Sequence, residues 1–244
     1  IVIPYFKNAQ HIKRSLKSVF EQTYQNFEII IINDYSPDWE EALPIINSFS
    51  DARIKTISHT SNKNGAAARN TGIKSAKGAY IAFLDADDEW LPNHLNNLIV
   101  SQEKENAEVT YTTCTVKSKN NFSYTVPKKS IGLSNNLGEY LFCDDGFMQT
   151  SCLLVKTATA QNVLFNESLR RHQEYDFLLK LEDANAKFSW SPVSTVIVHW
   201  ENNDIRNKGG TWDFSLQFVI DYKKYFTPKA FSRFILQFVV LPNI

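Results

Sequence analysis

The sequence has few cysteines, no excess of either charge and no long apolar run, and each absence excludes a class of protein. Three of its 244 residues are cysteine (Cys114, Cys143 and Cys152), and their spacing matches no zinc motif, so we expect reduced thiols. Lysine and arginine together number 26, as do aspartate and glutamate, so the whole-chain charge gives no sign of the basic surface that nucleic acids require. We therefore expect no nucleic-acid partner.

The chain also lacks the marks of membrane insertion and of secretion. No stretch is apolar over a length sufficient to span a bilayer. The N-terminus has no basic start, and Lys7 interrupts its apolar run after six residues, so it does not resemble a signal peptide. These absences predict a cytoplasmic protein. Apolar residues make up 43% of the chain, which excludes disorder and provides a core for one large α/β domain or two small ones.

Strand and helix patterns alternate in the first half of the chain. Residues 27–32 are a β-branched, apolar run typical of buried parallel strands, and residues 9–21 carry apolar side chains on one helical face. Strands joined by single helices imply right-handed crossovers and a mainly parallel sheet. The predicted strands are 1–3, 27–32, 53–58 and 79–84, and the predicted helices are 9–21, 38–49 and 66–76.

The pattern changes after about residue 105. Residues 111–126 are rich in Thr, Val and Tyr and predict a β-rich insertion. Further strands are predicted at 151–155 and 194–198, a helix at 174–183, and an aromatic helical segment at 211–241. The simplest organisation is one domain over 1–210, with a first half (1–105) and a second half (106–210), followed by a C-terminal helical extension (211–244).

Ligands of open parallel sheets bind beyond the carboxyl ends of the strands, so the residues that follow each strand are the first candidates. Pro4-Tyr5-Phe6 ends the first strand and offers an aromatic ring that could stack on a nucleobase. Asn33-Asp34-Tyr35-Ser36 follows the second and offers a carboxylate to a base or a ribose. Each has a plainer interpretation, as a strand-end aromatic and as an ordinary turn respectively.

Residues 64–72 place small side chains at the start of a helix, where a ligand can approach the backbone closely, and Arg69 adds a rigid cation. The glycine spacing fits neither a P-loop nor a dinucleotide fingerprint. Close packing of an alanine-rich helix explains residues 66–68, but it does not explain an arginine among them.

Asp85-Ala86-Asp87-Asp88 puts three carboxylates in four residues directly after an apolar strand. A hard divalent cation, Mn²⁺ or Mg²⁺, would relieve their repulsion, and such ions commonly take one or two carboxylates together with substrate phosphates. The alternative is a solvated acidic turn in which Asp88 caps a helix that begins near Leu91.

The order and spacing of these four clusters resemble glycosyltransferase family 2, whose members have the GT-A fold, over roughly residues 1–200. The resemblance implies an α/β protein with a Rossmann-like, mainly parallel central sheet flanked by helices. It implies that Asp87 binds Mn²⁺ or Mg²⁺. It also implies that a nucleotide-sugar is bound by Pro4, Phe6, Asp34, Arg69, Asp85 and Ala86.

The family's general base opens a late helix, and in this chain Glu174 falls on its position. Helical spacing places Glu174 on the same face as Phe177 and Leu181, which predicts that it faces the core. Asp176 points elsewhere on the helix and is predicted to form a surface ion pair with Lys180. The plainer interpretation of Glu174 is a first-turn acid that the helix dipole favours.

Three features beyond residue 198 extend the resemblance. His199 is a candidate metal ligand, against the alternative of a structural histidine, and Lys208 is a candidate diphosphate contact in a loop that could close over the donor. In the C-terminal segment, apolar residues at helical spacing lie among lysines and arginines. This helix could dock on an anionic membrane, or it could pack on the domain or on a second subunit.

The resemblance implies a nucleotide-binding half over 1–105 and an acceptor-binding half over 106–210. It also implies an inverting enzyme that transfers a sugar from a nucleotide-sugar, by default a UDP-sugar, to a hydroxyl group, with Glu174 as the base. The acceptor would be a saccharide or a lipid-linked saccharide, in bacterial surface polysaccharide synthesis at the cytoplasmic face of the inner membrane. The chain departs from the family in having Asn33 for the first acid of the turn and Glu for Asp at the base. The alternatives are a non-catalytic sugar-nucleotide-binding domain and a nucleotidyltransferase, although the latter would need a basic, glycine-rich loop after the first strand.

Overall fold

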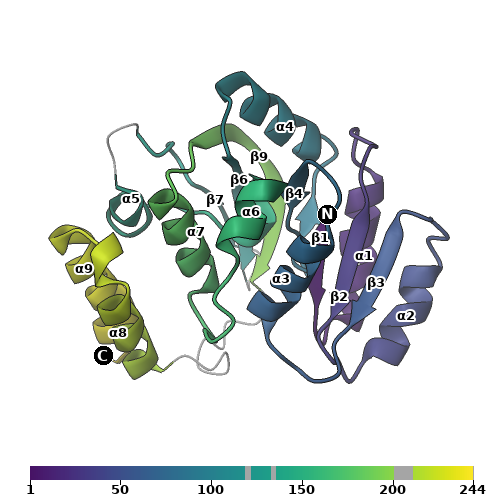
Figure 1. The fold of residues 1–244 in the computed structure, drawn as a ribbon, viewed down its shortest axis with the longest axis horizontal. Helices are drawn as coiled ribbons and strands as arrows, with labels where there is room; N and C mark the ends of the chain where they lie inside the picture. The colour runs from purple at the N-terminus through teal and green to yellow at the C-terminus, as the bar shows by residue number, and fades with distance from the viewer. Residues whose placement is uncertain (119–121, 133–135, 201–210, 244) are drawn as a thin grey trace.

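The computed structural model describes residues 1–118, 122–132, 136–200 and 211–243, and within these ranges the protein is an α/β sandwich (Figure 1). In the first half, β1 (Val2–Tyr5), β2 (Ile29–Asn33) and β3 (Ile54–Ser58) pair in parallel. The connecting helices are α1 (Ala9–Phe20) and α2 (Trp39–Asn47). The predicted parallel sheet and its crossover helices are therefore confirmed for this half.

An isolated parallel β-bridge connects this parallel sheet with the second sheet of the described residues. Helix α3 (Gly65–Ser75) leads to β4 (Tyr80–Ala82), and just beyond β4 the residue Phe83 bridges to Val2 of β1 in parallel. The strands consequently follow one another in the order β3-β2-β1-β4-β8-β6-β9-β5.

The second half of the sheet is mostly antiparallel. Its strands are β5 (Glu89–Trp90), β6 (Val109–Ser118), β7 (Ser123–Val126), β8 (Leu153–Lys156) and β9 (Phe188–Trp200), and among them β6 and β9 alone run parallel. Residues 111–126 are therefore not an insertion as predicted. Most of β6 lies within this stretch, in the interior of the sheet, and its polar threonines pair with β9 through hydroxyl groups such as Thr110 Oγ1 to Ser189 Oγ (2.6 Å).

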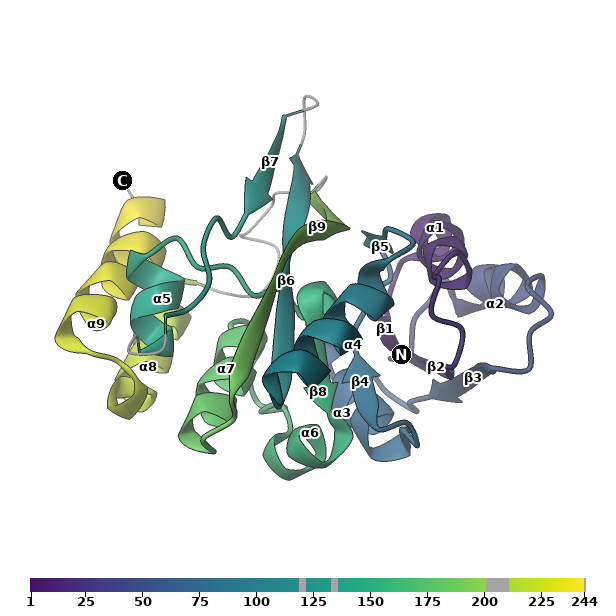
Figure 2. The ribbon, with the colours of Figure 1, turned by 90° about the horizontal axis from the view of Figure 1, so that it is seen from above.

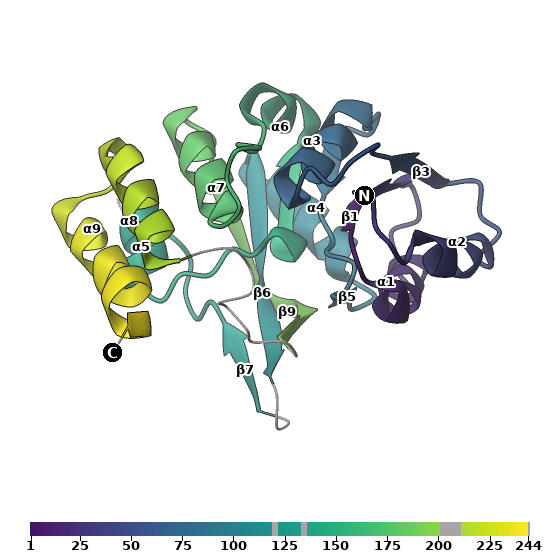
Figure 3. The same cartoon turned by 90° about the horizontal axis from the view of Figure 1, so that it is seen from below.

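Two hydrophobic cores lie on the two faces of the sheet, because successive strand residues point to opposite sides. In β2, Ile30 and Ile32 face one core, whereas Ile29 and Ile31 face the other. The first core is covered by α3, α6 (Thr157–Val163) and α7 (Gln173–Asp183), which lie side by side in Figure 3. The second is covered by α1, α2 and α4 (His94–Glu105).

Helix α4 begins later than the sequence indicated. Its N-cap is Asn93, so Asp88 does not cap it, and the capping interpretation of Asp88 is wrong. Asp88 is instead buried before the short strand β5.

The C-terminal helices pack on the domain. Helices α8 (Trp212–Asp221) and α9 (Pro228–Ile235), with a π-helical turn (Leu236–Val240), lie against α5 (Leu137–Cys143) and α7 (Figures 1 and 2). The ring of Phe142 stacks on Phe226 (5.3 Å) and meets the edge of buried Phe234 (5.1 Å). The sequence analysis left open whether the C-terminal helix docks on a membrane, packs on the domain or packs on a second subunit. The face that carries Phe226 and Phe234 packs on the domain. No helix within the described ranges is long and apolar enough to cross a membrane.

We expect buried His94 to make the protein less stable in acid. Burial lowers its pKa from 6.5 to about 3, so between these values the unfolded chain binds the additional proton. Falling pH should then destabilise the native state by about 1.4 kcal/mol per pH unit. The His94→Phe variant can keep a ring stacked on Trp90 (4.4 Å between centroids), but that ring does not titrate. The variant should therefore lack the contribution of His94 to the pH dependence of the unfolding free energy. Urea unfolding across this window measures it, and an unchanged slope in the variant would contradict the assignment.

Candidate active site

A cleft at the carboxyl ends of β1, β2 and β4 brings together the donor-site residues predicted from the described part of the chain. Its volume is about 180 Å³, and Gly65 and Ala68 of α3 form part of its wall. The predicted residues that line it are Pro4, Phe6, Asp34, Arg69, Asp85, Ala86 and Asp87. The topology thus confirms that these segments meet at one edge of the sheet, as the strand-end rule requires.

Arg69 joins the parts of this site. Its Nη2 atom lies 2.6 Å from Asp85 Oδ1 and also donates to Thr150 Oγ1 (3.3 Å), while Nη1 donates to Gln173 Oε1 (3.3 Å). The side chain is 8% exposed. One buried cation therefore connects α3, the acidic loop after β4, the turn before β8 and the start of α7.

The charge of Arg69 is stabilised by the carboxylates around it. Burial by itself lowers the pKa of the guanidinium, but Asp85, Glu174 and Asp87 more than offset this effect, and the pKa lies above its usual value. The acids predicted for the ribose, the catalytic base and the metal are therefore all electrostatically coupled to the same cation.

Asp34 uses its carboxylate to hold a loop. Its Oδ1 accepts hydrogen bonds from the backbone N–H of Lys63 (2.8 Å) and contacts His59 Nδ1 (2.7 Å). Its Oδ2 accepts from Asn62 Nδ2 (2.9 Å) and from the N–H of Asn64 (2.8 Å). Because a carboxylate offers about four lone pairs, these partners occupy it fully.

Asn33 and His59 complete the turn around Asp34. The Oδ1 atom of Asn33 accepts from the N–H of Ser36 (2.8 Å), so the turn interpretation holds for Asn33. His59 lies at the carboxyl end of β3, and its Nε2 contacts Thr71 Oγ1 (2.9 Å). Sequence reasoning missed His59, although the strand-end rule applied to β3 would have found it.

A 3₁₀ turn (Thr150–Cys152) and the residue before it supply further partners of the acidic loop, and the sequence analysis did not identify them. Gln149 Nε2 donates to Asp85 Oδ2 (2.9 Å) and to Asp88 Oδ2 (3.1 Å), and Ser151 Oγ donates to Asp88 Oδ2 (2.6 Å). The pKa of Asp88 is raised well above its usual value, first by burial and then by the repulsion of Asp85 and Asp87.

The chemistry of the acidic loop suits a divalent cation brought by a substrate. Asp87 is half-buried and lines the cleft. Within the described ranges, no group of three or more acidic, histidine or cysteine side chains is assembled for a metal. Mg²⁺ and Mn²⁺ do not need such a group, because one or two carboxylates suffice when phosphates and water complete the shell.

His199 lies beside the acidic loop. Its backbone N–H donates to Asp88 Oδ1 (3.1 Å), and its Nε2 lies 2.9 Å from Glu89 Oε1. Glu89 of β5 therefore orients the imidazole of His199, which lies near the end of β9. The other candidate of this region, Lys208, lies outside the residues that the structure describes.

Glu174 lies in the first turn of α7 and is half-buried. Its negative charge helps to raise the pKa of Arg69. Its neighbour Gln173 reaches across the cleft wall to Arg69 and to the N-cap of α3, Asn64 Oδ1 (3.3 Å). The start of α7 is thereby fixed against the start of α3.

Asp176 is not a surface residue, and the prediction that it lies on the surface is wrong. The predicted pair with Lys180 is present (3.0 Å), but Asp176 is 0% exposed and also accepts from Tyr222 OH (2.6 Å) and from the N–H of Asn166 (2.7 Å). Helix α8 carries the chain to Tyr222 and covers this side of α7.

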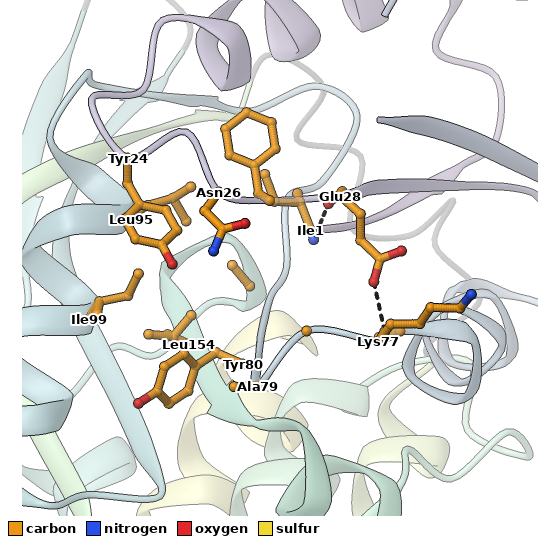
Figure 4. A pocket seen from close by; sticks show the side chains of 14 residues that line it. Ile1, Tyr24, Asn26, Glu28, Lys77, Ala79, Tyr80, Leu95, Ile99 and Leu154 are labelled. Atoms are coloured by element: carbon orange, nitrogen blue, oxygen red, sulfur yellow. Dashed lines mark hydrogen bonds between the residues drawn. The ribbon is translucent and has the colours of Figure 1, made fainter. Parts of the chain in front are cut away.

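A second hollow lies at the opposite end of the strands, beside Ile1 (Figure 4). The backbone carbonyl of Glu28 accepts from the N-terminus of Ile1 (2.7 Å), and its side chain accepts from the N–H of Lys77 (2.7 Å). None of the predicted site residues lines this hollow, and it faces the amino ends of β1 and β2.

Comparison with known proteins points to one family. The model of "Glycosyl transferase family 2" matches residues 1–165. An amylovoran biosynthesis glycosyltransferase, AmsB of Erwinia amylovora, is 34% identical over 195 residues, which are 77% of this chain and 65% of that protein. The Escherichia coli UDP-Glc:alpha-D-GlcNAc-diphosphoundecaprenol beta-1,3-glucosyltransferase WfgD is 37% identical over 132 residues, 53% of this chain and 51% of that protein. This chain therefore spans about half to two thirds of these relatives.

The fold matches a solved glycosyltransferase structure. Residues 1–349 of S. aureus TarS in complex with UDP-GlcNAc superpose with a TM-score of 0.75 at 17% identity, over 97% of this chain and 72% of that one. At this identity the similarity establishes the GT-A fold.

We expect Arg69→Met to lower the free energy of unfolding by about 3 kcal/mol, because it leaves the partly buried Asp85 carboxylate without its cation. Lys55→Met is the matched control, since its ion pair with Glu28 is equally short (2.7 Å) but half-exposed, and its loss should cost less than about 1 kcal/mol. Urea denaturation of both variants measures the difference. Equal losses would show that Arg69 does not organise the site.

Proposed function

This chain belongs to glycosyltransferase family 2, and we propose that it is an inverting glycosyltransferase that moves a sugar from a nucleoside-diphosphate sugar to a hydroxyl group of an acceptor. The observation that carries this proposal is the cleft at the carboxyl edge of the sheet, which Asp85 and Asp87 line together with Arg69. The guanidinium of Arg69 pairs with Asp85 (2.6 Å) and is joined by Gln173 (3.3 Å) to the start of α7, where Glu174 lies.

The donor is proposed to be a UDP-sugar. The name of one relative specifies UDP-Glc, and the TarS structure was solved with UDP-GlcNAc. In this chain the exposed ring of Phe6 and the backbone at Pro4 are proposed to hold the base. Asp34 is proposed to act indirectly, because its carboxylate fixes the loop 62–64 beside the donor. Asp85 and Ala86 are proposed to lie beside the ribose of the donor.

Asp87 and His199 are proposed to be the two protein ligands of Mn²⁺ or Mg²⁺. The donor diphosphate would supply further ligands. When bound, such a cation neutralises negative charge on the leaving diphosphate. Arg69 keeps the acidic loop in place by its ion pair with Asp85, so the chain presents Asp87 to the diphosphate without rearranging the sheet edge. Lys208 is proposed as a further diphosphate contact.

Glu174 is proposed as the general base. Its carboxylate would take the proton from the acceptor hydroxyl while that oxygen forms a bond to the anomeric carbon. The bond from this carbon to the diphosphate oxygen breaks on the opposite side, which inverts the anomeric configuration and releases the nucleoside diphosphate. Gln173 anchors the start of α7 to Arg69 and so holds the base at a fixed distance from the donor.

The acceptor is proposed to be a saccharide, free or attached to a lipid diphosphate, in the assembly of a bacterial surface polysaccharide. The relatives support this, since one is an amylovoran biosynthesis glycosyltransferase and another is named for glucosyl transfer to GlcNAc-diphosphoundecaprenol. Leu236, Val240 and Leu241 remain exposed beside the basic residues of α9. They are proposed to bring the enzyme to the cytoplasmic face of the membrane.

Nucleotide binding should require both the metal and Asp87. Calorimetry with UDP, GDP, dTDP and CMP is expected to show tight binding of UDP in the presence of Mn²⁺. Omission of the metal or the Asp87→Ala substitution should weaken that binding at least about tenfold, since each removes the charge that holds the diphosphate. If UDP binds equally well without metal, the acidic loop is not a metal motif.

Glu174→Gln should abolish transfer and spare donor binding. We expect turnover of UDP-glucose with GlcNAc-diphosphoundecaprenol to fall by a factor of about 10² to 10⁴, the usual contribution of a general base. Glu103→Gln, the same change at an exposed position of α4, is the control. A non-catalytic nucleotide-sugar-binding domain would bind UDP and show no turnover in the wild type, and this outcome would refute the proposed activity.

A further inference from the structure

Four aromatic rings from three segments of the chain form a cluster at the border of the second core, here called the aromatic shelf: Phe122, Tyr124, Phe147 and Trp200. Trp200 lies at its centre, with ring centroids 6.5 Å from Tyr124 and 6.0 Å from Phe147, and Phe122 lies 5.8 Å from Tyr124. Phe122 is 63% exposed and Trp200 39%. Large rings that pack together and yet remain exposed commonly mark a binding surface.

The aromatic shelf is tied to the acidic loop of the candidate site. Trp200 directly follows His199, whose backbone N–H donates to Asp88. Phe147 lies two residues before Gln149, whose side chain donates to Asp85 and Asp88. At about 3.5 Å of chain per residue, the backbones of Trp200 and Phe147 lie within about 7 Å of residues that contact the acidic loop.

A groove of about 280 Å³ extends from the aromatic shelf toward the C-terminal helices. Tyr124 and Phe147 form one wall, and the turn after α9 forms the other. Figure 2 shows β7 standing out from the domain on the side of these helices. Polar groups reach into the same groove from both walls, namely Asp145, Arg233 and Gln237.

We propose that the aromatic shelf and this groove form the acceptor subsite, which takes a pyranose ring of the acceptor saccharide. The proposal rests on the proposed function, because it assigns the second substrate of the same reaction. Phe142, which also lines the groove, contacts Tyr175 (4.9 Å), the residue after Glu174, so the groove adjoins the start of α7 as well as the acidic loop.

The lining fits a sugar better than a lipid chain. A pyranose presents an apolar C–H face that packs on aromatic rings, and a rim of hydroxyls that hydrogen-bond to carboxylate, guanidinium and amide groups. A polyprenyl chain would desolvate Asp145 and Arg233 and offer them no partner, which is costly. The lipid of a lipid-linked acceptor would therefore lie along the apolar end of the groove, where Leu236 and Leu241 are exposed.

Fluorine NMR of 5-fluorotryptophan-labelled protein, loaded with UDP and Mn²⁺, tests the proposal. Trp200→Phe identifies the Trp200 signal among the five tryptophans. N-Acetylglucosamine, glucose and galactose are titrated separately, and farnesyl phosphate is the lipid probe. We expect at least one sugar to shift the Trp200 signal saturably. The Asp145→Asn substitution should lower the affinity for that sugar about tenfold. Trp212, which is 50% exposed on α8, should not respond.

Kinetics separate this inference from the proposed function. Trp200→Ala should raise the KM for GlcNAc-diphosphoundecaprenol about tenfold and leave UDP affinity unchanged, and Trp212→Ala should change neither. If UDP binds and no sugar shifts Trp200, or if farnesyl phosphate alone does, the acceptor subsite is overturned and the donor site stands. If the wild type does not bind UDP, the proposed function itself fails.

Discussion

The buried guanidinium of Arg69, which pairs with Asp85 and donates to Thr150 and Gln173, joins segments that are far apart in the chain. A guanidinium held almost out of water is stable when anions and hydrogen-bond acceptors surround it, and here Asp85, Thr150, Gln173 and the field of Glu174 do so. These partners come from the loop after β4, the turn before β8 and the start of α7. Their positions are fixed together, so the acidic loop and the candidate base keep a constant separation.

The acidic loop combines this constraint with an excess of negative charge. Asp88 is buried beside Asp85 and Asp87, and Ser151, Gln149 and the backbone of His199 donate to its carboxylate. These donors hold the loop without adding a full positive charge. A divalent cation that arrives with a diphosphate would supply one, which explains physically why three acids are tolerated at one strand end.

Long-range packing accounts for the places where the sequence analysis and the structure differ. A helical wheel assigns one buried face to α7, but α8 covers a second side of this helix, and Asp176 is therefore buried against Tyr222. The change of pattern after about residue 105 predicts a β-rich insertion at 111–126, but most of threonine-rich β6 lies there, in the interior of the sheet. Its threonine side chains are tolerated in the interior of the sheet because their hydroxyls pair with those of β9, a partner almost 80 residues away. Gln149 was identified as a site residue only through such contacts, with Asp85 and Asp88.

The sequence by itself determined the alternation of strands and helices in the first half, the four strand-end clusters and, through them, the family. It could do so because local periodicity reports which face of an element is buried, and because a parallel sheet brings the carboxyl ends of its strands to one edge. Only the tertiary structure decided the mixed second half of the sheet, the packing of the C-terminal helices and the partners of each acid. Those depend on contacts between distant segments, and no local pattern in a single chain encodes which distant surface a side chain will meet.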